Sequence, residues 1–473
     1  MQINLLLILP FILFFSYHPV IPLGSTENMN LELSLPLIWL ALYAAISLPQ
    51  FFSFLKHLGF KKSSLLALFP LYLLLSLFWS SNPLRTILTA GIIICLIISV
   101  CTFPELIKKH PEIKSKLASS LLLSAVLVSI FCWAQCLMDV AGIGRSATLL
   151  CEGCTYQSFG FPHPNGFAIE PQFMGSLLLA PIALSFYLLF VADTKAKKRR
   201  YLLLTFFLTT TLFLVFSRGA IYSFLVVTIV AIAGLIIKKS SSSLVKPLLA
   251  IPIILLSLIA ALFAQGIFAE LSPTSEHFST AIAKSIHQLS LGKLDFRSPV
   301  ATQEPANASS ENTASPEPTD SSDQTPHFSG YVAESTDYRL SLNEIAIKTW
   351  SKNPKNILLG VGLGAAGPAM YQTEPSLGSP KEIVQNEYIS ILLELGLFGM
   401  IFCFLSIFAL FISIKNFSLR SQTPKNYRTK LLFLGCLTLA FLLSLNFFSG
   451  LPNALHIYLL IPLGLVAIIA TKH

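Results

Sequence analysis

Two ionisable residues interrupt long apolar stretches of this sequence. Arg218 lies in Ser217-Arg218-Gly219, in the middle of the apolar stretch 201–237. Glu394 lies about two helical turns into an apolar stretch that begins at residue 388. A charge at membrane depth is unfavourable, so such residues usually face a cavity or a partner and have a function. The alternatives are an arginine that reaches lipid headgroups and a carboxylate at the membrane interface.

A third polar group comes just before the apolar stretch that starts at residue 166. The segment FPHPNGFA (161–168) contains His163 and Asn165. Both side chains could point into a cavity at the membrane surface. The alternatives are a structural histidine and an asparagine that caps the following helix.

Further polar residues precede Glu394. Arg339 opens a predicted amphipathic helix, and Gln385, Asn386 and Glu387 come directly before the apolar stretch at 388. Between them lies GVGLGAAG (360–367). Glycine-rich backbone can bind phosphate through its N–H groups. This stretch lacks the Lys-Ser/Thr pair of a nucleotide-binding loop, so we do not predict a nucleotide site.

The composition is that of a membrane protein. The chain has 473 residues, of which 54% are hydrophobic and 12% charged, with a mean hydropathy of +0.71. Soluble domains carry about 25% charged residues. Because the apolar runs are continuous and do not alternate, they predict membrane-spanning helices and not a β-barrel. We therefore predict an all-α polytopic bundle and no nucleic-acid partner.

Twelve apolar segments are long enough to be spans. We take the first as a retained span and not a cleaved signal peptide, because no Lys or Arg precedes it. The spans divide the chain into residues 1–268, a large loop at 269–387, and residues 388–473. They lie at 3–23, 31–55, 64–80, 86–103, 118–138, 166–191, 201–217, 219–237, 246–268, 388–414, 428–449 and 453–471.

The loops predict an orientation. Short loops on one side of this map carry 21 Lys and Arg residues, and those on the other side carry 3. Because basic loops stay in the cytoplasm, both termini are predicted to be cytoplasmic and the large loop external. The net charge of +9 is explained by the same loops.

The large loop is predicted to contain a disordered segment between two helices. Residues 299–327 are rich in Pro, Ser, Thr and Glu and are predicted to be disordered. Apolar residues at helical spacing on either side, from 278 to 289 and from 342 to 350, predict amphipathic helices. Cys151 and Cys154 are the only two of eight cysteines outside the spans. They are either a local disulfide or free thiols, because a metal needs more ligands.

Taken together, these features resemble the O-antigen ligase and O-antigen polymerase superfamily of bacterial polytopic membrane glycosyltransferases. The resemblance implies transfer of a glycan from undecaprenyl diphosphate to a lipid or glycan acceptor, at the outer face of the inner membrane. It implies no metal and no cofactor. The motifs that carry it are WSSNP (79–83), FPHPNGFA (161–168), SRGA (217–220), GVGLG (360–364) and QNEYISILLELGLFG (385–399).

The resemblance also implies roles for single residues. Arg218 and Arg339 would bind the diphosphate and neutralise it as it leaves. Family ligases usually have a histidine where this chain has Gln385. An amide cannot accept the acceptor's proton. Either binding geometry therefore suffices, or a neighbour such as His163 or Glu387 supplies the base, or the protein is not an active ligase.

Asn165, Asn386, Glu387 and Glu394 are predicted to bind substrate. We expect Arg218, Arg339 and Gln385 to converge within roughly 10–15 Å on one external cavity. The alternatives that remain open are a polymerase of the same superfamily, a transporter or flippase, and a non-catalytic partner in envelope assembly.

Overall fold

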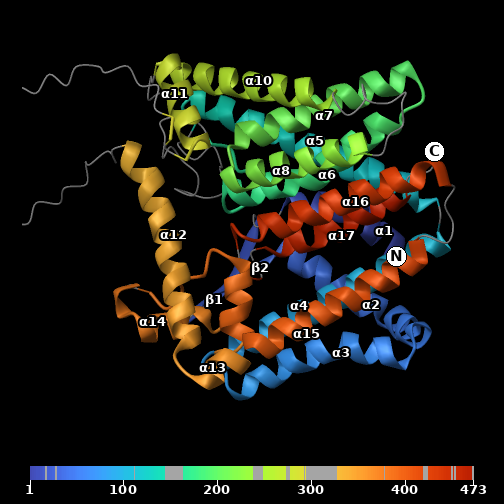
Figure 1. Cartoon of the computed structure of the whole chain (residues 1–473), viewed down its shortest axis with the longest axis vertical. Coiled ribbons are helices and arrows are strands. Elements are labelled where there is room, and N and C mark those ends of the chain that lie inside the picture. The colour runs from blue at the N-terminus through green and yellow to red at the C-terminus, as the bar shows by residue number, and fades with distance from the viewer. Residues whose placement is uncertain are drawn as a thin grey trace, which may run out of the picture.

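The protein folds mainly as helices (Figure 1). The computed structural model describes residues 1–15, 19–26, 29–110, 112–143, 163–237, 249–272, 277–291, 293–294, 328–377, 379–418, 424–448, 451 and 454–470. Cys151, Cys154 and the segment 299–327 lie outside these ranges, so the predictions made for them stay predictions.

The helices and strands follow in chain order. They are α1 (Gln2–Phe14), β1 (Val20–Thr26), β2 (Met29–Ser34), α2 (Leu35–Leu58), α3 (Phe60–Leu75), η1 (Ser76–Phe78), α4 (Pro83–Lys109), α5 (Ile113–Val140), α6 (Pro171–Val191), α7 (Lys195–Val215), α8 (Arg218–Ile237), α10 (Ala250–Leu271), α11 (Phe278–Leu289), α12 (Phe328–Ser351), α13 (Pro354–Leu359), α14 (Ala366–Thr373), η2 (Pro375–Leu377), α15 (Glu387–Ser418), α16 (Pro424–Ser444) and α17 (Leu455–Ala470).

Each predicted span overlaps one α-helix. Among the described residues, six helices are long and apolar enough to cross a membrane: α2, α4, α5, α6, α10 and α15. Five shorter helices, α1, α3, α8, α16 and α17, are also apolar. The chain is therefore a helical membrane protein, and the count of twelve crossings stays a prediction.

The predicted first span is wrong in its second half. Helix α1 ends at Phe14, and Val20–Thr26 forms strand β1, which pairs antiparallel with β2. Pro19 and Pro22 have no N–H to donate to a helix, and the β-branched Val20 and Ile21 favour a strand. The continuous apolar run therefore contains both a helix and a strand, and the fold includes one small β-hairpin.

Helix α6 is the centre of the larger core. Of its 21 residues, 15 are buried, because it packs against α5, α7, α8, α16 and α17. Most of the buried hydrophobic side chains that the structure describes join this one cluster. The start of α6 is therefore held on several sides by other helices.

A smaller core joins α3, α4 and α15, and its main feature is a break inside α15. Gly396 has φ 63° and ψ −169°, so the helix is interrupted there. The glycine-rich stretch binds the freed carbonyls: the N–H groups of Val361 and Gly362 donate to the oxygens of Leu393 and Glu394, both at 2.9 Å. The stretch thus caps the broken helix.

The glycines of this stretch lie where there is no room for a side chain. A β-carbon on Gly360 would lie 2.3 Å from the Glu394 oxygen, and one on Gly362 would lie 2.4 Å from Ser80 Cβ. Both glycines have positive φ angles, +76° and +105°. Close packing and backbone conformation account for the motif without a phosphate ligand.

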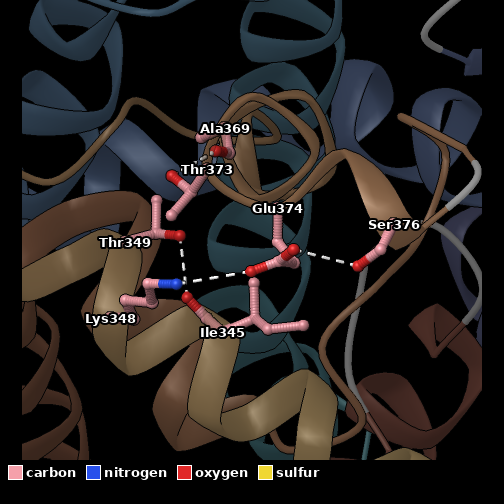
Figure 2. A network of polar contacts seen from close by, with 7 residues as sticks. All are labelled: Ile345, Lys348, Thr349, Ala369, Thr373, Glu374 and Ser376. Carbon is pink, nitrogen blue, oxygen red and sulfur yellow. Dashed lines mark hydrogen bonds and ion pairs between the residues drawn. The ribbon is translucent and has the colours of Figure 1, made fainter.

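Helices α11 to α14 gather at one end of the bundle, and Figure 1 shows both chain termini at the opposite end. Helix α12, in orange, stands across the ends of the long helices. A polar network fastens it to α14 (Figure 2): Lys348 Nζ lies 3.3 Å from Glu374 Oε2, and the Ser376 hydroxyl donates to Glu374 Oε1 at 3.0 Å.

Candidate active site

Arg218 is the first residue of α8, directly after the predicted break. Helix α7 ends at Val215, and Phe216 takes a left-handed conformation with φ 57°. The Ser217 hydroxyl accepts from the N–H of Ala220 at 3.4 Å and so caps α8. The predicted turn between two helices is therefore present.

Gln265 from α10 supports this turn. Its amide donates to the carbonyl oxygens of Phe213 and Leu214, at 3.3 and 3.4 Å. These are carbonyls of the last turn of α7, which have no partner within the helix. The Ser285 hydroxyl from α11 donates to Gln265 Oε1 at 3.1 Å. Three helices thus fix the backbone that carries Arg218.

His163 lies next to Arg218. It is 7% exposed, and its ring meets that of Phe216 edge-on, with centroids 5.6 Å apart. Burial, and then the positive charge of Arg218, lower the pKa of His163 from 6.5 to about 3. The imidazole is therefore neutral at pH 7 and binds protons weakly.

Asn165 does not cap α6, which removes the alternative to its predicted role in substrate binding. The helix begins at Pro171, five residues after the predicted span, and Glu170 is its N-cap residue. Asn165 Nδ2 instead donates to the oxygen of Ala168 at 2.6 Å, and Asn165 Oδ1 accepts from Gln135 Nε2 at 3.3 Å. Hydrogen bonds with α5 keep this segment out of the helix.

Gly166 completes the same loop. Its N–H donates to Gln135 Oε1 at 2.9 Å, and its φ is +61°. A β-carbon there would lie 3.0 Å from Met174 Sδ. Glycine therefore lets the chain turn tightly between His163 and the start of α6.

Arg339 lies near Glu170, at the other end of this loop. Burial raises the pKa of Glu170, and the positive charge of Arg339 from α12 opposes that rise. The segment 163–170 therefore has Arg218 beside its first residue and Arg339 beside its last. Sequence reasoning missed Glu170, although a carboxylate inside the predicted span 166–191 is itself a signal.

The three residues at the start of α15, Gln385, Asn386 and Glu387, differ in what they contact. Asn386 Oδ1 accepts from the N–H groups of Tyr388 and Ile389, at 3.0 and 3.2 Å, so it caps α15. Glu387 is 9% exposed. Gln385 is half-buried and lies two residues before it. A role for Asn386 in substrate binding would therefore fall to its Nδ2.

The turn after α16 joins these elements. The Glu387 N–H donates to the Leu445 oxygen at 2.9 Å. Phe447 packs on Gly219, where a β-carbon would come within 2.6 Å of the ring. Gln172 of α6 donates to the Phe447 oxygen. The starts of α6, α8 and α15 thus meet around one turn, next to His163 and Arg218.

Glu394 lies at the break in α15, and its carboxylate also interacts with that of Glu387. Arg85 from α4 and the backbone N–H groups of Gly364 and Ala366 act on its carboxylate. Sequence reasoning missed Arg85 as its partner. The structure therefore gives Glu394 a packing role at the break, while its predicted role in substrate binding stays a prediction.

The arrangement suits an anionic ligand. Two guanidinium groups flank one loop, and arginine binds phosphate oxygens through two parallel hydrogen bonds. Among the described residues, no group of three or more His, Cys, Asp or Glu side chains could hold a metal ion.

Comparison with known proteins agrees with the motifs. Residues 202–404 match the sequence model of the O-antigen ligase family. The match includes Arg218, Arg339 and Gln385, and His163 lies before it. No curated protein matches the chain. This domain match, with the motifs that surround it, supports the resemblance of the chain to the O-antigen ligase superfamily.

Proposed function

We propose that this protein transfers a glycan from undecaprenyl diphosphate to a hydroxyl acceptor at the outer face of the bacterial inner membrane. The observation that carries the proposal is the placement of Arg218 and Arg339 at the two ends of one short loop, 163–170. A diphosphate has two charged groups, and two guanidinium groups match them.

The chemistry follows from this placement. The acceptor oxygen attacks the anomeric carbon of the donor sugar, and the bond from that carbon to the diphosphate oxygen breaks. The electron pair goes to the diphosphate, where Arg218 and Arg339 stabilise the developing charge. Guanidinium groups supply this charge without a metal ion, so we propose that transfer is metal-independent.

The acceptor's proton needs a base. Gln385 cannot take it, and burial beside Arg218 leaves His163 with a pKa of about 3. Glu387 is a buried carboxylate next to the Leu445–Phe447 turn that touches the start of α8. We therefore assign the base to Glu387 before His163, with Gln385 holding the acceptor hydroxyl.

The proposed orientation places α11 to α14 outside the cell. The contrast of 21 against 3 basic residues in short loops supports it, and so does the shared position of the termini opposite these helices. The loop 163–170 would then lie at the headgroup level of the outer leaflet, where a lipid-linked diphosphate is found.

The test is turnover by purified, reconstituted protein with an undecaprenyl-diphosphate glycan and an acceptor. We expect release of the carrier, and a loss of about 10²–10³-fold in kcat for Arg218→Ala and for Arg339→Ala. Lysine at either position should recover part of the rate, because it restores charge without the bidentate geometry.

Arg200→Ala is the matched control, because this exposed arginine lies in the basic start of α7. Its turnover should equal that of the wild type. Unchanged turnover in both arginine variants at the site would contradict the proposal. A ladder of products would assign a polymerase, and a single product a ligase. Passage of the intact donor across the membrane without carrier release would point to a transporter.

A further inference from the structure

A tyrosine of α17 contacts the carboxylate that is proposed as the base. The side chain of Tyr458 forms a hydrogen bond with that of Glu387, the first residue of α15. The phenol O–H donates and a carboxylate oxygen accepts. Tyr458 belongs to none of the motifs described above and lies outside the family match at residues 202–404. The contact therefore brings a further residue to the candidate site from outside the matched domain.

Aromatic packing holds the Tyr458 ring in place. The ring meets that of Phe441 from α16 edge-on, with centroids 5.5 Å apart. Two residues earlier on α17, His456 packs edge-on against Phe173 of α6, at 5.6 Å. Aromatic pairs in this geometry are favourable beyond the area that they bury. The start of α17 is thus fixed between α6 and α16, which limits how far the phenol can move.

Glu387 is held through its backbone as well. Its N–H donates to the Leu445 oxygen at 2.9 Å, and the phenol of the next residue, Tyr388, donates to the Leu442 oxygen at 2.7 Å. Both oxygens lie near the C-terminal end of α16, close in sequence to the Phe441 ring on which Tyr458 packs. The backbone of Glu387 is therefore tied to the end of α16, while its carboxylate is tied to α17.

A carboxylate with one fixed oxygen is suited to act as a base. Burial disfavours its charged form, whereas a hydrogen bond from a phenol favours that form. The phenol engages one carboxylate oxygen and leaves the other to accept the proton of an acceptor hydroxyl. The titratable and charged groups around this pair are His163 and Arg218 beside the turn at 445–447, Tyr388, Glu394 and Cys403 on α15, and His456 on α17.

We propose that Tyr458 is a positioning residue for Glu387, whose phenol keeps the carboxylate ionised and directs its second oxygen to the acceptor hydroxyl. During transfer the O–H bond of the acceptor breaks, the proton goes to Glu387, and the oxygen's electron pair forms the bond to the anomeric carbon. The bond from that carbon to the diphosphate breaks, and the phenol keeps its own proton. The inference rests on the proposed function and deepens it.

The test compares Tyr458→Phe with the wild type in the reconstituted turnover assay over a range of pH. The variant keeps the ring that packs on Phe441 and loses only the phenol oxygen. Because the ionised carboxylate then lacks one donor, we expect the acidic limb of the kcat/KM profile to move up by about one pH unit. The kcat on the plateau should fall on the order of tenfold, since the base is less well oriented.

Tyr388→Phe is the matched control. It also removes a phenol hydrogen bond at the start of α15, but that bond goes to a backbone oxygen and not to the carboxylate. Its acidic limb should match that of the wild type, and melting temperatures confirm that each variant folds. A wild-type profile in Tyr458→Phe, an equal shift in Tyr388→Phe, or full turnover in Glu387→Gln overturns the proposal.

Infrared spectroscopy separates this inference from the proposed function, because it needs no turnover. The C=O band of protonated Glu387 is identified as the band that Glu387→Gln lacks. As the pH falls, this band should appear about one pH unit higher in Tyr458→Phe than in the wild type, whether or not the protein transfers a glycan. Equal titration of the band in both proteins overturns the inference, while loss of turnover in Arg218→Ala would still support the proposed function.

Discussion

At the scale of single residues, burial decides what His163 can do. A histidine beside a reactive centre suggests a base, and the sequence alone permits that interpretation. The structure buries this ring on Phe216 and next to Arg218, and both effects lower its pKa. A neutral His163 can orient a ligand at neutral pH, but it removes protons poorly until an anion binds beside it.

The same pKa predicts how stability depends on pH. The pKa of His163 falls from 6.5 in an unfolded chain to about 3 in the folded protein. Below pH 6.5 the unfolded chain therefore binds a proton that the folded protein does not. The stability that neutral His163 provides is fully present above pH 6.5 and is lost as the pH falls toward 3.

We expect the melting temperature of the wild type to fall more steeply between pH 6.5 and 3 than that of His163→Asn. Thermal unfolding in detergent over this range measures both slopes. His57→Asn is the control, because His57 is exposed, and its slope should match the wild type. Parallel curves for His163→Asn and the wild type would show that His163 does not stay neutral.

At the scale of elements, the break in α15 depends on two facing segments. The stretch 360–364 and the kink at Gly396 come within backbone contact, and Tyr72 of α3 donates to the Leu395 oxygen at 2.7 Å. Because the freed carbonyls bind N–H and O–H groups, the helix can stop and restart inside apolar surroundings. The start of α15, with Gln385 and Glu387, is thereby held independently of the rest of the helix.

Glycine substitutions test this arrangement. Gly362→Ala should lower the melting temperature, because a left-handed conformation alone costs about 1–2 kcal/mol in an L-residue. The added carbon also meets Ser80 at 2.4 Å. Gly91→Ala in α4 is the matched control, with no atom within 4 Å of the new carbon. It should be neutral or stabilising by about 0.5–1 kcal/mol. Equal melting temperatures for the two variants would contradict the packing described here.

At the scale of the whole molecule, the positions of the ends decide the topology. Both termini lie at the end of the bundle opposite α11 to α14. A chain with both ends on one side of the membrane must cross it an even number of times. The basic loop between α6 and α7 belongs to the same side as the termini in the predicted map. The charges of the loops and the positions of the termini therefore favour the same orientation in the membrane.

Reporter fusions test this topology. Alkaline phosphatase inserted within residues 299–327 should be active, because it folds only outside the cytoplasm. The same enzyme inserted after Asp193, in the basic loop, should be inactive. A fluorescent protein at the C-terminus should fluoresce. Activity after Asp193 together with inactivity in the large loop would reverse the orientation.

The sequence by itself determined where the apolar helices lie and where one of them breaks. A membrane helix needs about 20 apolar residues, which local composition reveals. The break at Ser217–Gly219 was visible for the same reason, because a polar interruption of an apolar run needs no knowledge of neighbours. The resemblance to the family was also visible, since its motifs are short and contiguous.

Only the tertiary structure decided which side chains act together. Glu170 lies beside Arg339, Glu394 beside Arg85, and Tyr72 beside Leu395, which is 323 residues away. The hairpin at Val20–Thr26 and the late start of α6 likewise depend on pairing with distant or facing groups. Burial, charge and hydrogen bonding act through space, so partners that are far apart in the chain leave no local pattern from which the site could be read.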